Sequence, residues 1–298
     1  MPLISFLNEQ SICYKLNEAM KNHTSFKIGG ECDYFITPKS VAELKAVIDK
    51  LNELSIPYFI LGKGSNILVS DKGITGAVIS LLGISGITVK DDEITAAAGE
   101  TVASLCNEAL KNELSGLEFA FGIPGSVGGG LYMNAGAYGG ELANTVISAE
   151  YLTADGEVKT VTNEEMALGY RTSIFKTNGG IILSATFKLE KGDKAEIKEK
   201  MDDYLNRRKT KQPLEFGSAG STFKRPTGYF AGALIEKNGL KGKMVGGARV
   251  SEKHAGFVIN YKNATASDVK KLMAEIQKIV KENDGVELEP EVIFVGKE

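Results

Sequence analysis

Apolar residues recur at helical spacing in three segments of the chain, and each recurrence predicts an amphipathic helix. In residues 40–55 the apolar side chains fall on one face, and Ser40 opens an S-x-x-E capping box. Residues 100–114 and 267–283 show the same periodicity, and Gly285 follows the second of these as a helix terminator. The pattern therefore predicts three helices that each bury one face.

Short apolar runs bounded by turn residues predict the β-strands. Residues 58–61 and 67–69 flank a glycine-containing turn, and residues 181–189 form a longer run. Residues 151–161 have the pattern of a hairpin that turns at 154–156. Strands and helices follow one another without regular alternation, which favours mixed α+β layers over a doubly wound parallel sheet.

A highly charged stretch at residues 191–211 separates a glycine-rich first part of the chain from the remainder. Such charge density predicts a solvated surface helix and has no catalytic implication. We therefore place a first domain at residues 1–192, with subdomains of about 1–80 and 81–192, and a second domain at 193–298. This division leaves open that the last strand of the chain returns to the first domain.

The charge balance and the scarcity of some residue types exclude several classes of protein. The 35 basic and 38 acidic residues give a net charge of −3 and a pI near 5.7, which argues against a protein that coats nucleic acid. No apolar stretch approaches the roughly 20 residues that span a bilayer, and no secretory signal is visible, so we expect a cytoplasmic protein without membrane insertion. Two histidines and three widely spaced cysteines predict neither a metal site nor a disulfide framework.

Glycine is the compositional outlier, with 34 of 298 residues against a usual level of about 7%. Eight glycines lie within residues 122–140, and a second glycine-containing turn covers residues 62–66. Glycine leaves backbone N–H groups uncovered, so both segments can wrap a phosphate or lie against a flat ring. The competing interpretation is a tightly folded Ω-loop without a ligand. Neither a P-loop nor a G-x-G-x-x-G motif is present, so a nucleotide would need another architecture.

Seven segments between residues 24 and 292 resemble known flavoproteins. Leu61–Asn66 (LGKGSN) and Gly122–Gly129 (GIPGSVGG) resemble the FAD-binding domain of the vanillyl-alcohol-oxidase/cresol-methylhydroxylase type. Five further segments are similar to the UDP-N-acetylenolpyruvoylglucosamine reductase family, and they are Thr24–Gly30, Tyr170–Ser173, Gly220–Lys224, Val250–Phe257 and Leu288–Val292. The resemblance implies an α+β fold in which a two-part FAD-binding domain precedes a C-terminal α+β substrate-binding domain.

The resemblance also implies a reaction. In that family NADPH reduces non-covalently bound FAD, and hydride then reaches the enolpyruvyl group of UDP-N-acetylglucosamine-enolpyruvate, which gives UDP-N-acetylmuramate. By the same resemblance Ser221 is the proton donor, and Arg171 and Glu291 stabilise the enolate. Taken singly, these three residue types serve more often as turn caps or exposed charges. The resemblance implies no nucleic acid and no obligate protein partner.

The implied FAD contacts lie in the two glycine-containing segments, and they are Leu61, Gly62, Lys63, Gly64, Ser65, Asn66, Gly122, Ile123, Pro124, Gly125, Ser126, Gly128, Gly129, Asn134, Ala135 and Gly136. The implied substrate contacts are Lys211, Lys224 and Arg225. Arg225 stands where relatives often have asparagine, and Ile293 stands where they often have arginine. The short stretch between residues 170 and 211 is similar to the shorter second type of the family. We interpret His254 as a structural residue, because it has no evident partner in the sequence.

Two other functions remain open at this point. One is a flavin-dependent oxidase of a sugar or alcohol with the same fold. The other is a non-catalytic nucleotide-binding regulator that uses the glycine-containing turns without redox chemistry.

Overall fold

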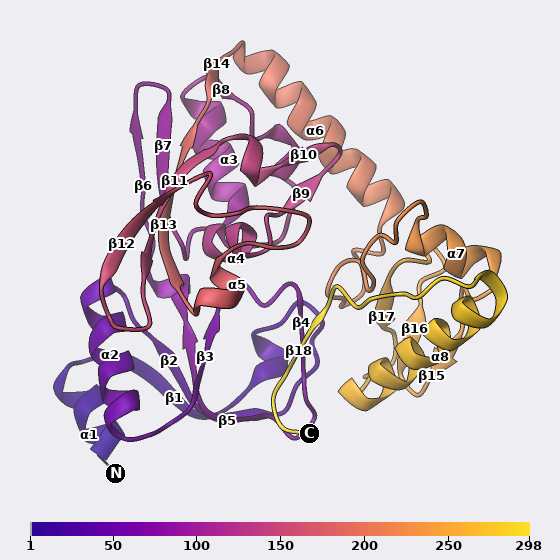
Figure 1. The fold of residues 1–298 in the computed structure, drawn as a ribbon, viewed down its shortest axis with the longest axis horizontal. Coiled ribbons are helices and arrows are strands. Elements are labelled where there is room, and N and C mark those ends of the chain that lie inside the picture. Colours follow the sequence, from indigo (N-terminus) through magenta and orange to yellow (C-terminus); the bar gives the residue numbers. More distant parts are fainter. Residues whose placement is uncertain (1) are drawn as a thin grey trace. The chain divides into compact units, whose positions relative to one another are not determined.

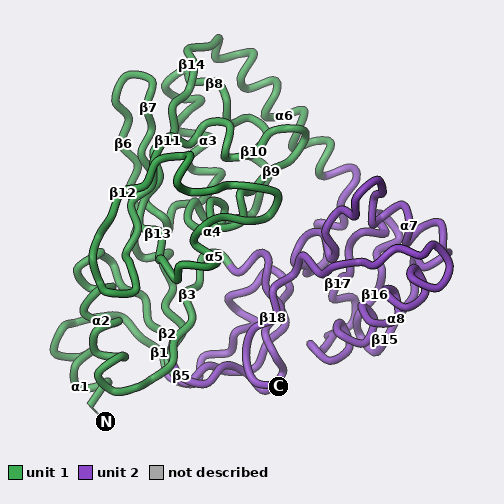
Figure 2. Tube along the Cα trace, viewed as in Figure 1, with its two compact units in different colours: residues 1–15, 34–63, 77–208 green, residues 16–33, 64–76, 209–298 purple. Residues whose placement is uncertain are grey.

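A computed structural model of the chain describes residues 2–298 and has two compact units, each discontinuous in sequence (Figures 1 and 2). Unit 1 contains residues 1–15, 34–63 and 77–208, and unit 2 contains residues 16–33, 64–76 and 209–298. The chain passes between the units at five places. Three lie within strands, which are β1 (Cys13–Ala19), β2 (Glu31–Thr37) and β5 (Ile74–Ser80), one lies in the turn at residues 63–64, and one lies at residues 208–209 of the charged helix. The division at residue 192, which the charged stretch at 191–211 predicts, stays a prediction beside these units.

The larger sheet of unit 1 has five antiparallel strands in the order β12-β11-β13-β7-β6. These strands are β6 (Ile87–Lys90), β7 (Glu93–Ala97), β11 (Val146–Leu152), β12 (Val158–Thr162) and β13 (Ile181–Lys188). Across its middle, Ala185 pairs with both Ala149 and Ala96, and all three are buried. The small side chains leave room for α4 (Val127–Tyr132) to pack against β13 and β7.

The second sheet has the order β1-β2-β5-β3, and β3 (Tyr58–Leu61) is parallel to the part of β5 that belongs to unit 1. The other elements of unit 1 are α1 (Pro2–Glu9), β8 (Leu114–Ser115), β9 (Gly136–Ala137), β10 (Gly140–Glu141), α5 (Phe175–Asn178) and β14 (Glu190–Lys191). The charged segment forms α6 (Lys194–Lys211), of which only Ile197 and Met201 are buried. The prediction of a surface helix is therefore confirmed.

The three amphipathic helices predicted from periodicity are all present, as α2 (Val41–Glu53), α3 (Val102–Lys111) and α8 (Ala266–Asp284). Ser40 Oγ accepts a hydrogen bond from Glu43 N at 3.1 Å, as the capping pattern predicts. The Glu43 carboxylate, however, accepts from Lys39 N at 2.8 Å, so the reciprocal half of the predicted box is replaced by a bond one residue earlier. The predicted strands at 58–61, 67–69 and 181–189 and the predicted hairpin are also confirmed.

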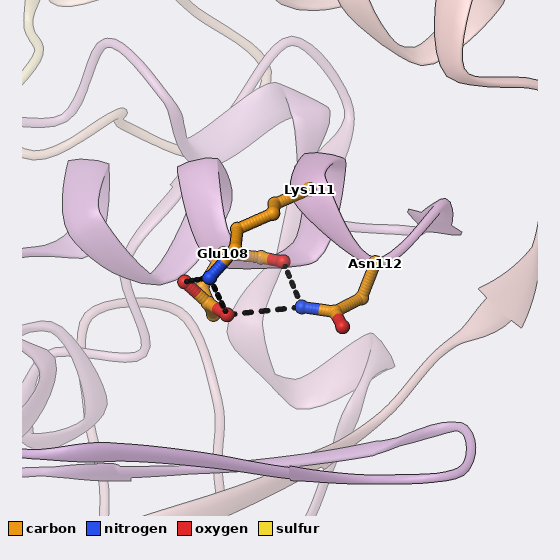
Figure 3. Close-up of polar contacts among 3 residues, drawn as sticks. All are labelled: Glu108, Lys111 and Asn112. Atoms are coloured by element: carbon orange, nitrogen blue, oxygen red, sulfur yellow. Dashed lines mark hydrogen bonds and ion pairs between the residues drawn. The ribbon is translucent and has the colours of Figure 1, made fainter.

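Side chains terminate α3 three residues before the predicted end (Figure 3). Asn112 Nδ2 donates to the Glu108 carbonyl at 2.8 Å and to Glu108 Oε1 at 3.0 Å, and Lys111 Nζ lies 3.1 Å from the same carboxylate oxygen. The last carbonyls of a helix lack intrahelical partners. The side-chain amide of Asn112 donates a hydrogen bond to one of these carbonyls, that of Glu108, so the helix can end at this residue.

Unit 2 has its own core and a three-stranded antiparallel sheet in the order β15-β16-β17. Its elements are β4 (Ile67–Val69), α7 (Ala231–Lys237), β15 (Met244–Val245), β16 (Ala248–Val250), β17 (Val258–Asn260), α8 and β18 (Ile293–Val295). β18 pairs in parallel with β4, with Ile293 opposite Ile67. Thr265 and Asp268 form a full capping box at the start of α8, and Gly285 ends the helix with φ +70°. Within residues 2–298, no helix combines the length and apolar character needed to cross a membrane.

We predict that Asp71→Ala destabilises unit 2. Its carboxylate accepts hydrogen bonds from Ala266 N at 2.7 Å and Ser267 N at 3.0 Å, which are two of the donors that the start of α8 leaves unsatisfied. Loss of both charge-assisted bonds should lower the free energy of unfolding by about 2 kcal/mol, measured by urea denaturation. Asp49→Ala, at an exposed position of α2, is the control and should change little. Equal effects of the two substitutions would contradict the prediction.

A second prediction concerns acid stability. A hydrogen bond from Thr265 N holds the pKa of Asp268 below its ordinary value of 3.8. A carboxyl group with a depressed pKa in the folded state contributes stability above its unfolded pKa and loses it as the pH falls. The difference in unfolding free energy between the native chain and Asp268→Asn should therefore be largest near neutral pH and should shrink below about pH 4. A constant difference from pH 7 to pH 3 would refute this assignment.

Candidate functional site

The turn between β3 and β4 presents backbone donors. Gly64 adopts φ +63°, and a Cβ atom there would lie 2.1 Å from the His23 carbonyl oxygen, so only glycine fits. Ser25 N donates to the Gly64 carbonyl at 3.1 Å and fixes the turn. Among the described residues, none accepts a hydrogen bond from the N–H groups of residues 62–66. Successive N–H groups that lack a protein acceptor suit an anion such as a phosphate.

The glycine-rich segment at 122–140 is not a loop throughout, because it contains α4 and the β9–β10 hairpin. Ser126 caps α4 and is buried, and its Oγ accepts a hydrogen bond from Gly129 N at 3.3 Å. A Cβ atom on Gly62 would lie 2.4 Å from that hydroxyl oxygen, and one on Gly128 would lie 2.8 Å from Ala98 Cβ. These glycines are therefore needed first for close packing within unit 1.

The residues before α4 lie beside a half-buried cation. Gly122 approaches Arg208 on α6, where an added Cβ would be 3.1 Å from Arg208 Cδ. Burial lowers the pKa of the Arg208 guanidinium from its ordinary value. Gly125 is buried and its carbonyl accepts a hydrogen bond from Val102 N at 3.0 Å, whereas Pro124 is exposed.

Asn134, a predicted cofactor contact, has a fully buried side chain that binds other parts of unit 1. Its Nδ2 donates to the Gly169 carbonyl at 3.1 Å, and its Oδ1 accepts from Ala143 N at 3.0 Å. Ala135 and Gly136 follow it, partly buried, and lead into β9. Asn134 thus joins the glycine-rich segment to the segment that carries Arg171.

Arg171 lies in a tight turn of unit 1 with a left-handed backbone, φ +56°. Gly169 and Thr172 exchange two hydrogen bonds of 3.2 Å across the turn. Arg171 Nη2 donates to the Gly136 carbonyl at 3.4 Å, and Lys176 Nζ donates to the Arg171 carbonyl at 2.6 Å. The turn is therefore fixed against the glycine-rich segment.

Unit 2 brings together the other two predicted catalytic residues. Ser221 is exposed and begins an extended segment that pairs with the segment ending in Glu291, through a bond of 2.9 Å from Glu291 N to the Thr222 carbonyl. On its other side Thr222 Oγ1 accepts from Val258 N at 2.8 Å. Asn66 Nδ2 donates to the Glu291 carbonyl at 3.1 Å, so the end of the 62–66 turn lies beside the same segment.

Two of the three predicted substrate contacts, Lys224 and Arg225, have partners within unit 2. Lys224 pairs with Glu289, and the Arg225 guanidinium lies 4.0 Å from the centre of the exposed Phe230 ring. Lys211 is exposed at the end of α6. His254 accepts a hydrogen bond from Gly256 N at its Nδ1 at 3.1 Å, and burial lowers the pKa of its imidazole. This bond within its own loop agrees with a structural role for His254.

The sequence reasoning assigned no role to Arg208 or to Lys176. Arg208 lies in a charge-rich helix, and nothing in that pattern distinguishes it from its solvated neighbours. Lys176 follows Arg171 by five residues, and this proximity was the one available signal. In the structure Arg208 lies against Gly122, and Lys176 binds the Arg171 carbonyl, so each contacts a predicted site residue.

Comparisons with known proteins find relatives over almost the whole chain. Residues 32–162 match the family described as an FAD binding domain, and residues 212–295 match the C-terminal domain of UDP-N-acetylenolpyruvoylglucosamine reductase. The UDP-N-acetylenolpyruvoylglucosamine reductase of Clostridium novyi (strain NT) is 51% identical over 296 residues, which are 99% of this chain and 96% of the relative. That of Caldanaerobacter subterraneus subsp. tengcongensis is 51% identical over 282 residues, with 95% and 93% covered. The solved structure of the Thermus caldophilus reductase has a TM-score of 0.79 at 35% identity, and the match covers 95% of this chain and 98% of that one.

We predict that Gly62→Ala lowers FAD content and thermal stability, because its Cβ would collide with the Ser126 hydroxyl oxygen, 2.4 Å away, and push residue 62 away from the start of α4. Removing the hydroxyl leaves the Ser126 Cβ 3.7 Å from the new methyl group, which is ordinary contact. The double variant Gly62→Ala/Ser126→Ala should therefore recover part of the lost FAD, measured by flavin absorbance after gel filtration. No recovery in the double variant would show that residue 62 is bare for another reason.

Proposed function

The chain belongs to the UDP-N-acetylenolpyruvoylglucosamine reductase family, and we propose that it catalyses the NADPH-dependent reduction of UDP-N-acetylglucosamine-enolpyruvate to UDP-N-acetylmuramate with serine as the proton donor. Two observations support the proposal. The relatives match almost the whole chain, and unit 2 pairs the segment that starts at Ser221 with the segment that ends at Glu291.

The residues of the FAD-binding domain fit the cofactor. The N–H groups of residues 62–66 have no acceptor among the described residues, and Lys63 adds an exposed cation to the same turn. Such a donor set suits the diphosphate of FAD. Arg208 beside Gly122 offers a partly desolvated cation to the same ligand. When bound, FAD supplies the hydride chemistry that links NADPH to the enolpyruvyl group.

Arg171 and Glu291 are proposed to hold the carboxylate of the substrate. Addition of hydride to the terminal vinyl carbon places negative charge on the neighbouring carbon and on the carboxylate attached to it. The planar guanidinium of Arg171 can donate two parallel hydrogen bonds to that carboxylate. Glu291 is proposed to act on the same group as a neutral acid. Both contributions grow as charge develops, so they stabilise the transition state more than the ground state.

Ser221 is proposed to donate its hydroxyl proton to the carbon beside the carboxylate. A serine hydroxyl is a weak acid, but the carbanion-like centre it protonates is a strong base, so the transfer is favourable in direction. The side chain is exposed for contact with a ligand, while the neighbouring Thr222 is buried and bonded on both sides. The backbone of unit 2 therefore fixes the residue that follows Ser221.

Lys211, Lys224 and Arg225 are proposed to contact the uridine diphosphate. Arg225, where relatives often have asparagine, brings a second cation next to Lys224, and its stacking on Phe230 limits its rotamers. Both proposed substrates are small metabolites, and we propose that the enzyme meets them in the cytoplasm.

Ser221→Ala tests the proposal. Reduction of the bound flavin by NADPH should keep its rate within about twofold, whereas the rate of its reoxidation by the enolpyruvyl substrate should fall by about 10²–10⁴-fold, measured by stopped-flow absorbance. Ser267→Ala, at an exposed serine of α8, is the matched control and should resemble the native chain in both steps. An equal loss in both half-reactions, or none in the second, would show that Ser221 is not the proton donor.

A further inference from the structure

We propose that Lys176 is a positioning residue for Arg171: its ammonium group holds the left-handed turn that aims the guanidinium, with Asn134 and Ser173 as accessory anchors. The inference rests on the proposed role of Arg171 and deepens it. It concerns residues of unit 1 alone, and each contact that carries it is described below.

The turn is held in a conformation that its own residues do not favour. A left-handed backbone brings the Cβ of any residue other than glycine close to a carbonyl oxygen, and it persists only where the surroundings enforce it. Arg171 has φ +56° and is not followed by glycine. The two 3.2 Å bonds between Gly169 and Thr172 close the turn but leave the Arg171 carbonyl pointing out of it.

Lys176 binds that outward carbonyl. Its Nζ lies 2.6 Å from the Arg171 oxygen, within the range of a charge-assisted hydrogen bond. Lys176 is the second residue of α5, and Phe175 before it is 2% exposed. The backbone from which the lysine side chain extends is therefore fixed by packing. Its ammonium group also lies 5.6 Å from the centre of the Tyr132 ring, on the last residue of α4. The lysine is therefore oriented by both its base and its surroundings.

Two more side chains tie the same segment to the last residue of α4 and to Asn134, two residues further on. Ser173 is 3% exposed, and its Oγ donates to the Tyr132 carbonyl at 2.8 Å. Asn134 is fully buried and donates to the Gly169 carbonyl at 3.1 Å. The turn is thus anchored before, at and after Arg171, and the bond from Lys176 is made to the backbone of Arg171, whose guanidinium separately donates to the Gly136 carbonyl.

Positioning matters at this residue because an arginine recognises a carboxylate through the geometry of its fork. A change of the backbone from the left-handed region to the ordinary helical or extended region redirects the Cα–Cβ bond and displaces the guanidinium. A displacement of about 1 Å at a reacting group can cost about 100-fold in rate. Loss of the Lys176 bond should therefore slow the step that uses Arg171 and leave the binding of FAD unaffected.

The experiment compares Lys176→Met, which keeps length and apolar stem but removes the donor, with Lys176→Arg, which restores a cationic donor. Lys159→Met is the control, because Lys159 pairs with Glu157 at the surface of the same unit. In Lys176→Met, reoxidation of the flavin by the enolpyruvyl substrate should slow by about 10–100-fold, while its reduction by NADPH and the FAD content stay within about twofold. The rate of Lys176→Arg should be within about threefold of the native rate, and the rate of Lys159→Met should equal the native rate.

A double-mutant cycle with Arg171→Gln separates positioning from a direct role. If Lys176 acts through Arg171, adding Lys176→Met to Arg171→Gln should cause no further loss. A further loss of tenfold or more would mean that Lys176 contacts the substrate itself and would overturn the proposal. A Lys176→Met rate equal to that of Lys159→Met, or an equal fall in both half-reactions, would overturn it as well.

Hydrogen exchange gives a readout that does not depend on the proposed reaction. The N–H groups of Gly169 and Thr172 should exchange at least tenfold faster in Lys176→Met and at the native rate in Lys176→Arg. If Arg171→Gln leaves both half-reactions intact, the proposed role of Arg171 is wrong. Faster exchange in Lys176→Met would then still establish that Lys176 holds the turn. Unchanged exchange in Lys176→Met would show that Lys176 does not hold the turn, independently of the role of Arg171.

Discussion

The parallel pairing of β18 with β4 is the constraint on which unit 2 depends. It places Ile293 opposite Ile67, so the residues just before β18 must run alongside the residues just before β4. Glu291 consequently lies next to Asn66, which donates to its carbonyl. The same extended segment pairs with the residues that follow Ser221. One short ladder therefore brings a turn near the start of the chain, a serine in its last third and a glutamate near its end into one unit.

In unit 1 the corresponding constraint is the close approach of backbones at the glycine-rich segment. Gly128 lies against Ala98, and Gly62 lies against the capping hydroxyl of Ser126. An added methyl group would collide with the neighbouring atom in both cases. The surplus of glycine first serves to bring α4 against the sheet and against the end of β3. The N–H groups of the 62–66 turn, which have no acceptor among the described residues, can then bind a ligand.

Elements with strong local periodicity were predictable from the sequence, and α2 and α8 lie within one or two residues of their expected bounds. The helix α4 was not, because three of its residues are glycines, which disfavour helix in isolation. It forms because Ser126 caps it and because only glycine lets it contact Ala98 so closely. The local signal pointed to a loop, and tertiary packing overrode it.

The predicted site residues came from motifs, and motifs give positions without contacts. They did not indicate that Asn134 binds backbone groups of its own unit, or that Arg171 adopts a left-handed backbone. A return of the last strand to the first part of the chain was left open, but its pairing with β4 was not predicted, because the two short strands lie more than 200 residues apart and no local pattern specifies the partner. The family resemblance was specific because its seven segments span nearly the whole chain.

The discontinuity of unit 2 has a consequence for how the protein is made. Its first two segments, 16–33 and 64–76, leave the ribosome long before β18 exists. At about 5–20 residues per second, Leu68 waits roughly 10–45 s for the strand that covers it. Phe26, Ile28 and Leu68 belong to a core that only residues beyond 209 complete. A nascent chain of this protein thus carries an apolar surface through most of its synthesis, which makes it a natural client for chaperones that bind such surfaces.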